Sequence, residues 1–219
     1  MIILLLILAF LFMILLAMQM SVFVSLEMGS KTAIKNFISS SEIHKIREIK
    51  NGPIREFLTG ITKKYNLSPN IKIYVFSGYN FIVSPFLVPE EVEDYSIFTL
   101  HTALNKSQSS IFISKDFLEK MDSKNVEYAI CHEIGHIKRS FRSKLKKSLT
   151  LSHINPFFKN LNLKIYFEED KLADSFAVTA TDKKGYIEFL KKVLNENPPK
   201  SRELTRMAKE RISALQALP

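Results

Sequence analysis

The first 26 residues form an apolar run that contains no charged side chain and is interrupted only by Gln19, Ser21 and Ser25. As a helix rising ~1.5 Å per residue, this run reaches roughly 39 Å, whereas the hydrocarbon core of a bilayer is about 30 Å thick. A cleaved signal peptide would start with basic residues and have a shorter apolar stretch. A buried core helix would normally carry a polar stripe. We therefore expect an uncleaved transmembrane anchor at residues 1–26.

Beyond the anchor, the hydrophobic pattern alternates between helical and strand periods. It predicts a polar helix over 30–50, a second helix over 53–65 that starts at Gly52-Pro53, and then a region of short strands. Strand candidates are 71–76, 81–83, 97–100 and 110–113, and the remainder is mostly helical with a long helix from about Asn125. The expected fold class is α+β, mostly helical with a small sheet. We divide the chain into an anchor (1–26), a connecting helix (27–52) and one domain (53–219).

The composition shows that the charged residues are confined to the part of the chain after the apolar run. The chain has 219 residues, a net charge of +9 and one cysteine, so collagen-like, disordered and disulfide-stapled classes are excluded. All 31 basic and 22 acidic residues lie after residue 26. Basic residues follow the span and none precedes it, which predicts a single-pass protein with its N-terminus outside and residues 27–219 in the cytoplasm. A basic domain beside a span favours anionic lipid as a partner. No nucleic acid is expected, because zinc-finger, RNP and helix-turn-helix signatures are missing.

The chemistry is carried by His132-Glu133-Ile134-Gly135-His136, an HExxH pattern inside the long helix. Residues four apart lie on the same helix face, so both imidazoles can bind one zinc ion. Glu133 is rotated about 100° around the axis and can act as general base towards a zinc-activated water. We also expect Gly135 to allow a strand or a substrate to approach closely.

A catalytic zinc usually has three protein ligands and a water. The sequence offers a group of carboxylates on a helix-like stretch downstream: Glu168, Glu169, Asp170 and Asp174. An acidic helix start that merely faces solvent is also compatible with these residues.

At this point the chain resembles the membrane-associated gluzincin metallopeptidases of the HtpX and CAAX prenyl protease class, in element order over roughly 53–215. In that family a second helix carries E-x-x-A-D. Matching Ala173-Asp174 to the A-D places Asp170 at the third-ligand position, where the family has Glu, with Glu169 as the fallback one residue out of register. The resemblance implies that Asp174 orients a zinc-binding imidazole. It implies a zincin-like fold and one zinc ion per chain. A late Arg, here Arg211, is also typical, whereas a family His before the late Pro is replaced by Asn197.

The resulting hypothesis is a membrane-anchored zinc endopeptidase that acts on a protein or peptide substrate. Two alternatives stay open: an ImmA-like regulatory peptidase, and a non-catalytic, membrane-tethered module with a degenerate zinc site. Cys131 should point away from the metal as a buried hydrophobic residue. His101 could line a cleft where a substrate adds to the sheet edge. The basic run 138–147 is predicted to be a solvated helix end or a lipid contact through Phe141, Leu145 and Leu149, and segment 140–166 could instead be a mobile lid.

Overall fold

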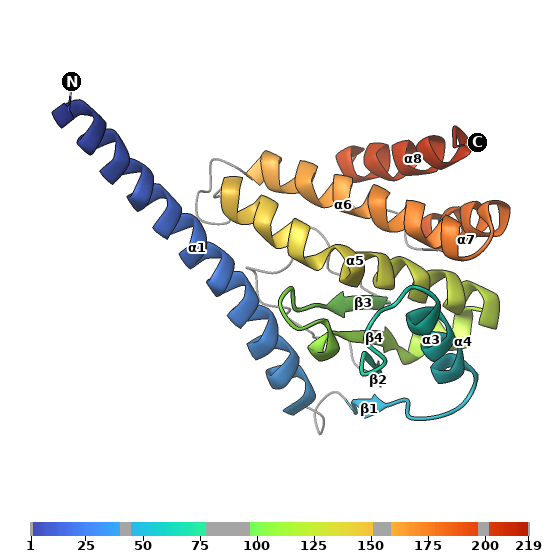
Figure 1. Cartoon of the computed structure of the whole chain (residues 1–219). Helices are drawn as coiled ribbons and strands as arrows, with labels where there is room; N and C mark the ends of the chain where they lie inside the picture. The colour runs from blue at the N-terminus through green and yellow to red at the C-terminus, as the bar shows by residue number, and fades with distance from the viewer. Residues whose placement is uncertain (1, 40–44, 78–96, 151–158, 197–201, 219) are drawn as a thin grey trace.

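The computed structural model describes residues 2–39, 45–77, 97–150, 159–196 and 202–218, and its first element is a single long helix, α1 (Ile2–Ser39). The helix is long and apolar enough to cross a membrane. Its first half stands away from the rest of the molecule, as Figure 1 shows. Only its second half contacts other elements through buried side chains, at Val22, Phe23, Glu27, Ser30 and Ile34.

The predicted connecting helix over 27–52 is found only in part: residues 27–39 are helical, whereas the described residues after 44 are not. Residues 27–39 continue α1 without a break, and Arg47–Glu48 form a short strand, β1. The reason is tertiary: β1 pairs antiparallel with β2 (Lys72–Phe76), with Arg47 opposite Val75. Local periodicity could not show this pairing, because its partner lies more than 20 residues away in the sequence.

A four-stranded sheet follows, in the order β1-β2-β4-β3. Its central strands β2 and β4 (Ser110–Ser114) run parallel, and β3 (Ile97–Leu100) pairs antiparallel with β4 at one edge. Strands at 71–76, 97–100 and 110–113 are therefore confirmed to within a residue. The candidate at 81–83 lies outside the described residues. The central strands are buried on both faces, which explains why Ile111, Phe112 and Ile113 form a continuous apolar run.

The helices after α1 are α3 (Pro53–Lys64), α4 (Lys115–Lys120), α5 (Ser123–Thr150), α6 (Lys159–Ala180), α7 (Lys183–Glu196) and α8 (Arg202–Gln216). Gly52 precedes α3 with φ 87°, a conformation that glycine adopts without strain, and Pro53 opens the helix. At the start of α5, the Asp122 carboxylate accepts a hydrogen bond of 2.8 Å from the Asn125 N–H and so caps the helix.

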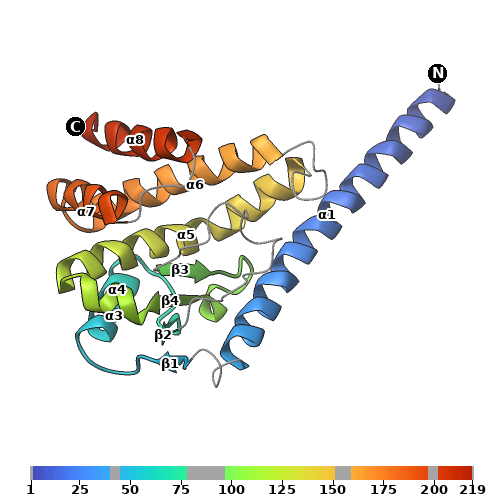
Figure 2. The ribbon, with the colours of Figure 1, turned by 180° about the vertical axis from the view of Figure 1, so that it is seen from behind.

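The α5 helix lies between the sheet and α6, and α8 lies along the other side of α6 (Figure 1; Figure 2 shows the same order from behind). Ile130, Ile134 and Ile137 are fully buried on α5, in one core with Ile73 and Ile111 of the sheet. Their spacing of three or four residues fixes which face of α5 points to the core. The fold is thus mostly helical with a small sheet, and this packing decides where the HExxH side chains point.

Candidate metal centre

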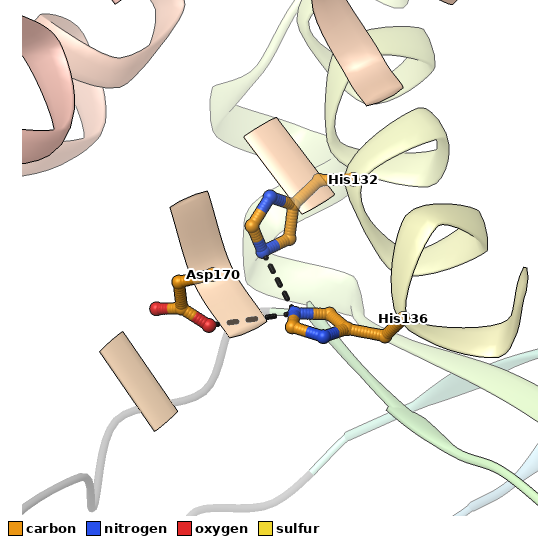
Figure 3. A group of neighbouring side chains, drawn as sticks. All are labelled: His132, His136 and Asp170. Carbon is orange, nitrogen blue, oxygen red and sulfur yellow. Dashed lines mark hydrogen bonds and ion pairs between the residues drawn. The ribbon is translucent and has the colours of Figure 1, made fainter. Parts of the chain in front are cut away.

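His132 and His136 lie one turn apart on α5, and their rings face the same point (Figure 3). Their Nε2 atoms are 3.1 Å apart, and their side chains keep only 15% and 18% exposure. The buried isoleucines hold α5 against the core and leave the imidazoles on its other side, towards α6. The i, i+4 spacing therefore produces the convergence that the motif predicts.

Asp170 of α6 completes a group of three. Its Oδ1 lies 3.4 Å from His136 Nε2, and the ligand atoms of His132, His136 and Asp170 all lie within 4.8 Å of one another. Ligand atoms about 2.0–2.1 Å from a tetrahedral zinc are separated by roughly 3.3 Å. The observed separations of 3.1 and 3.4 Å are close to that value. The donor set of two imidazoles and one carboxylate thus fits a zinc ion, although other divalent metals accept the same donors.

Gly135 explains how a side chain as short as Asp reaches this group. A Cβ at Gly135 would lie 2.8 Å from the Ala173 Cα, so α5 and α6 pack backbone to backbone at this position. Among the described residues, Gly135 therefore faces a helix, and the expectation that it faces a strand or a substrate is wrong. Asp170 lies one turn before Ala173, where the close packing of α6 shortens the distance that its carboxylate has to span.

Behind His132, three side chains form a hydrogen-bonded support. Asp174 of α6 is fully buried, and its Oδ1 lies 2.9 Å from His132 Nδ1. The Tyr186 hydroxyl donates to Asp174 Oδ1 at 2.7 Å and lies 3.1 Å from His132 Nδ1. Arg211 of α8 donates to both oxygens of Asp174 at 2.7 Å and to Asp170 Oδ2 at 2.8 Å. A carboxylate at Nδ1 keeps the proton on that atom and leaves Nε2 free to act as a ligand.

The electrostatics of the group follow from these contacts. Burial works against ionisation of Asp170, but the charge of Arg211 and the contact with His136 lower its pKa to about 2. The pKa of Asp174 falls further below its usual range, because Arg211 and His132 outweigh the effect of burial. For His136, burial lowers the pKa, yet the hydrogen bond with Asp170 and the charge of Glu133 raise it overall. Burial raises the pKa of Glu133, and the imidazoles only partly offset this.

The carboxylates of this cluster outnumber its guanidinium. Glu133, Asp170 and Asp174 are three carboxylates that interact electrostatically with the same guanidinium, Arg211. If all three carboxylates are ionised and the imidazoles are neutral, one guanidinium leaves two negative charges at the site, and the raised pKa values of Glu133 and His136 are the response of these groups to their surroundings when no cation is present. Buried charges are normally paired or coordinate a metal. A divalent cation at the three facing ligand atoms would balance that charge.

The neighbouring acidic residues point elsewhere. Glu169 is buried with its Oε2 3.9 Å from Arg139 Nε, and Glu168 pairs with Lys171 at 3.5 Å. The structure therefore brings Asp170, and not the fallback Glu169, to the two imidazoles.

Other residues from the sequence prediction are also placed. Cys131 is fully buried, as expected, and burial raises its pKa to about 12. His101 follows β3, and its pKa lies well below the usual value because of burial and the charges of Lys144 and His136. Its Nδ1 has no hydrogen-bond partner among the described residues. Asn197 lies outside the described residues.

Sequence reasoning missed Tyr186 altogether and gave Arg211 only as a mark of the family. Tyr186 lies 54 residues after His132 and shares no local pattern with it. Its complete burial together with a polar hydroxyl follows only from the packing of α7 against α5 and α6. No local sequence pattern indicates the contact of Tyr186 with His132 or the contacts of Arg211 with the two aspartates.

Comparisons with known proteins do not identify the chain. No protein-family model matches this sequence, and no curated protein matches it significantly.

Proposed function

We propose that the chain is a membrane-anchored, zinc-dependent endopeptidase with a zincin-like catalytic domain. The observation that carries the proposal is the convergence of His132, His136 and Asp170 from two helices, with Asp174 on the far nitrogen of His132. A ligand set of this kind, with an oriented imidazole, is the usual arrangement in catalytic zinc sites.

A zinc ion bound there would polarise a water molecule and the carbonyl of the substrate. With a zinc ion present, Glu133 would serve as the group that accepts a proton from the water and delivers it to the leaving amine. Burial raises the pKa of Glu133 above its usual value, which suits a residue that must both accept and release a proton. Asp174, Tyr186 and Arg211 hold His132 in one orientation. Among the described strands, β3 is at one edge of the sheet and packs beside α5, and this edge is our proposed place for an extended peptide to add to the sheet.

The proposed location is a membrane, with α1 as a single span. The exposed part of α1 is apolar on all sides, a pattern typical of a helix in lipid. Lys31 and Lys35 follow the apolar run, and basic residues beside a span favour its cytoplasmic side, which supports a cytoplasmic catalytic domain.

The test uses the full chain purified in detergent, with its zinc content and its cleavage of casein measured on the same sample. Glu133→Gln should keep the zinc of the parent protein and lose activity by about 10²- to 10⁴-fold, the usual contribution of a general base. The matched control is Glu127→Gln, the same change on the same helix at a residue that pairs with Lys124. The control should keep both properties.

The same samples separate the alternatives. Full activity of Glu133→Gln would reject the mechanism. Bound zinc with no cleavage of casein by the parent protein would favour the non-catalytic module. Cleavage confined to one repressor-like protein would favour the hypothesis of an ImmA-like regulatory peptidase.

A further inference from the structure

The C-terminal half of α5 presents large apolar side chains that no described residue covers. Phe141, Leu145 and Leu149 are 45%, 37% and 54% exposed. Because they are spaced by four residues, they lie along one face of the helix. Outside α1, these three make up most of the strongly exposed large apolar side chains in the described part of the chain; the others are Leu104 and Leu218.

This face is continuous with the apolar surface of α1. The Phe141 ring packs edge-on against Phe23 of α1, with their centroids 5.6 Å apart. Figure 1 and Figure 2 both show the end of α5 and the start of α6 beside the middle of α1. The exposed apolar positions of α1 therefore lie next to those of α5, and the two helices form one apolar surface.

A buried ion pair fixes this arrangement. Lys144 donates to Glu27 of α1 at 2.7 Å and to the Ser30 hydroxyl at 2.9 Å, and both charged side chains are at most 5% exposed. The remaining capacity of the Glu27 carboxylate is used by the N–H groups of Ala103 and Leu104, which donate at 2.7 and 3.3 Å. The position of α5 relative to α1 is thus set by several directional contacts.

The charged residues that border this face favour an anionic lipid membrane as its partner. Arg142 and Lys146 directly follow Phe141 and Leu145. Basic side chains that border an apolar helix face are typical of helices that lie in the interface of an anionic membrane.

We infer that the face formed by Phe141, Leu145 and Leu149 is immersed in the same lipid leaflet that α1 enters, so that α5 is a second membrane contact. The inference rests on the membrane span of the proposed function. Phe141 follows His136 by five residues, so the candidate metal site lies within roughly 8 Å of this face along the helix axis. Segment 140–166 is then, in its described part at the end of α5, a membrane contact.

The test measures the surroundings of a fluorescent label at single cysteines. Cys131 is the single cysteine of the chain and is fully buried, so Cys131→Ala provides the background. The labelled variants are Leu145→Cys and Leu149→Cys. Lys124→Cys is the matched control, because its side chain is 58% exposed at the other end of the same helix. Leu11→Cys, 55% exposed on α1, reports the span itself. The full chain is reconstituted into vesicles of phosphatidylcholine and phosphatidylglycerol, with an NBD label on the cysteine.

Labels at Leu145 and Leu149 should show a blue-shifted emission and a loss of intensity with brominated lipid comparable to the loss at Leu11, and iodide should have little effect. The label at Lys124 should be quenched by iodide and not by brominated lipid. If Leu145 and Leu149 behave like Lys124 while Leu11 is quenched by lipid, the inference is overturned and the span stands. Protection from both quenchers would show that protein, such as a second copy, covers the face, which also overturns it. If Leu11 is not quenched by lipid, the span fails and this inference fails with it, whereas the zinc and casein measurements are unaffected.

Discussion

Two groups of charged residues join α5 to neighbouring helices, and they differ in how completely their charges are paired. Near the end of the helix, Glu27 and Lys144 form a pair of opposite charges, and the pair's other contacts are two backbone N–H groups and a hydroxyl. Near the middle of α5, Arg211 donates to Asp170 and Asp174 and interacts with Glu133 only electrostatically, and two imidazole nitrogens face each other at 3.1 Å.

The difference separates a structural contact from a binding site. The first group is neutral as a whole and needs no further partner. The second has three carboxylates and one guanidinium, so protons or a cation must balance its charge, and its ligand atoms face one point. Since uncompensated buried charge is costly, a folded chain retains such a group where a cation completes it. The comparison therefore supports a metal at the group around Asp170. It supports a purely structural contact between α1 and α5 at the pair of Glu27 and Lys144.

The largest expected effect comes from breaking the ion pair between Glu27 and Lys144. Lys144→Met should lower the free energy of unfolding by about 3–5 kcal/mol, because it leaves the Glu27 carboxylate buried without its cation. Thermal unfolding of the full chain in detergent measures this loss. Adding Glu27→Gln to the same variant should recover much of it, since the unpaired charge is then removed. Loss of less than about 1 kcal/mol in the single variant would mean that the pair is solvated, as surface pairs are.

The next largest effect is expected from a change in the spacing of α5 and α6 at the candidate metal site. Gly135→Ala should push α6 away from α5, because the new Cβ would meet the Ala173 backbone at 2.8 Å. We expect a loss of about 1–3 kcal/mol in stability. A zinc titration should also show an affinity at least ~10-fold weaker, as for other changes that displace a ligand's support. Gly60→Ala on α3 is the control, because nothing lies within 4 Å of its added Cβ. Unchanged zinc affinity in Gly135→Ala would show that the helix spacing does not set the site.

A smaller effect concerns the support of His132. Asp174→Asn should weaken zinc binding by about 10- to 100-fold, because the amide can no longer hold the proton on His132 Nδ1 as a carboxylate does. Tyr186→Phe should weaken it less, since it removes one neutral hydroxyl and costs about 1 kcal/mol. Competition with a chelator of known affinity measures both. Equal affinities in the parent and Asp174→Asn would show that this carboxylate has no influence on the metal.

Sequence alone predicted the parts of this account that depend on local pattern. The apolar period of α5 and the i, i+4 spacing of His132 and His136 are properties of one helix, so the convergence of these imidazoles followed from the chain itself. The resemblance to gluzincins then suggested Asp170 and Asp174 in the register that the structure shows. The strand β1 was missed because it is formed by pairing with β2. The contacts of Glu27, Tyr186 and Arg211 were missed because each joins elements that are distant in sequence.

The most direct measurement is the zinc content of the purified full chain, determined by mass spectrometry for the parent protein, Asp170→Ala and Glu169→Ala. The account predicts about one zinc ion per chain in the parent. It predicts strongly reduced zinc in Asp170→Ala and nearly full zinc in Glu169→Ala, since Glu169 lies against Arg139 and away from the imidazoles. A parent protein without zinc would contradict the central claim. Full zinc in Asp170→Ala together with loss in Glu169→Ala would show that the third ligand is the other carboxylate.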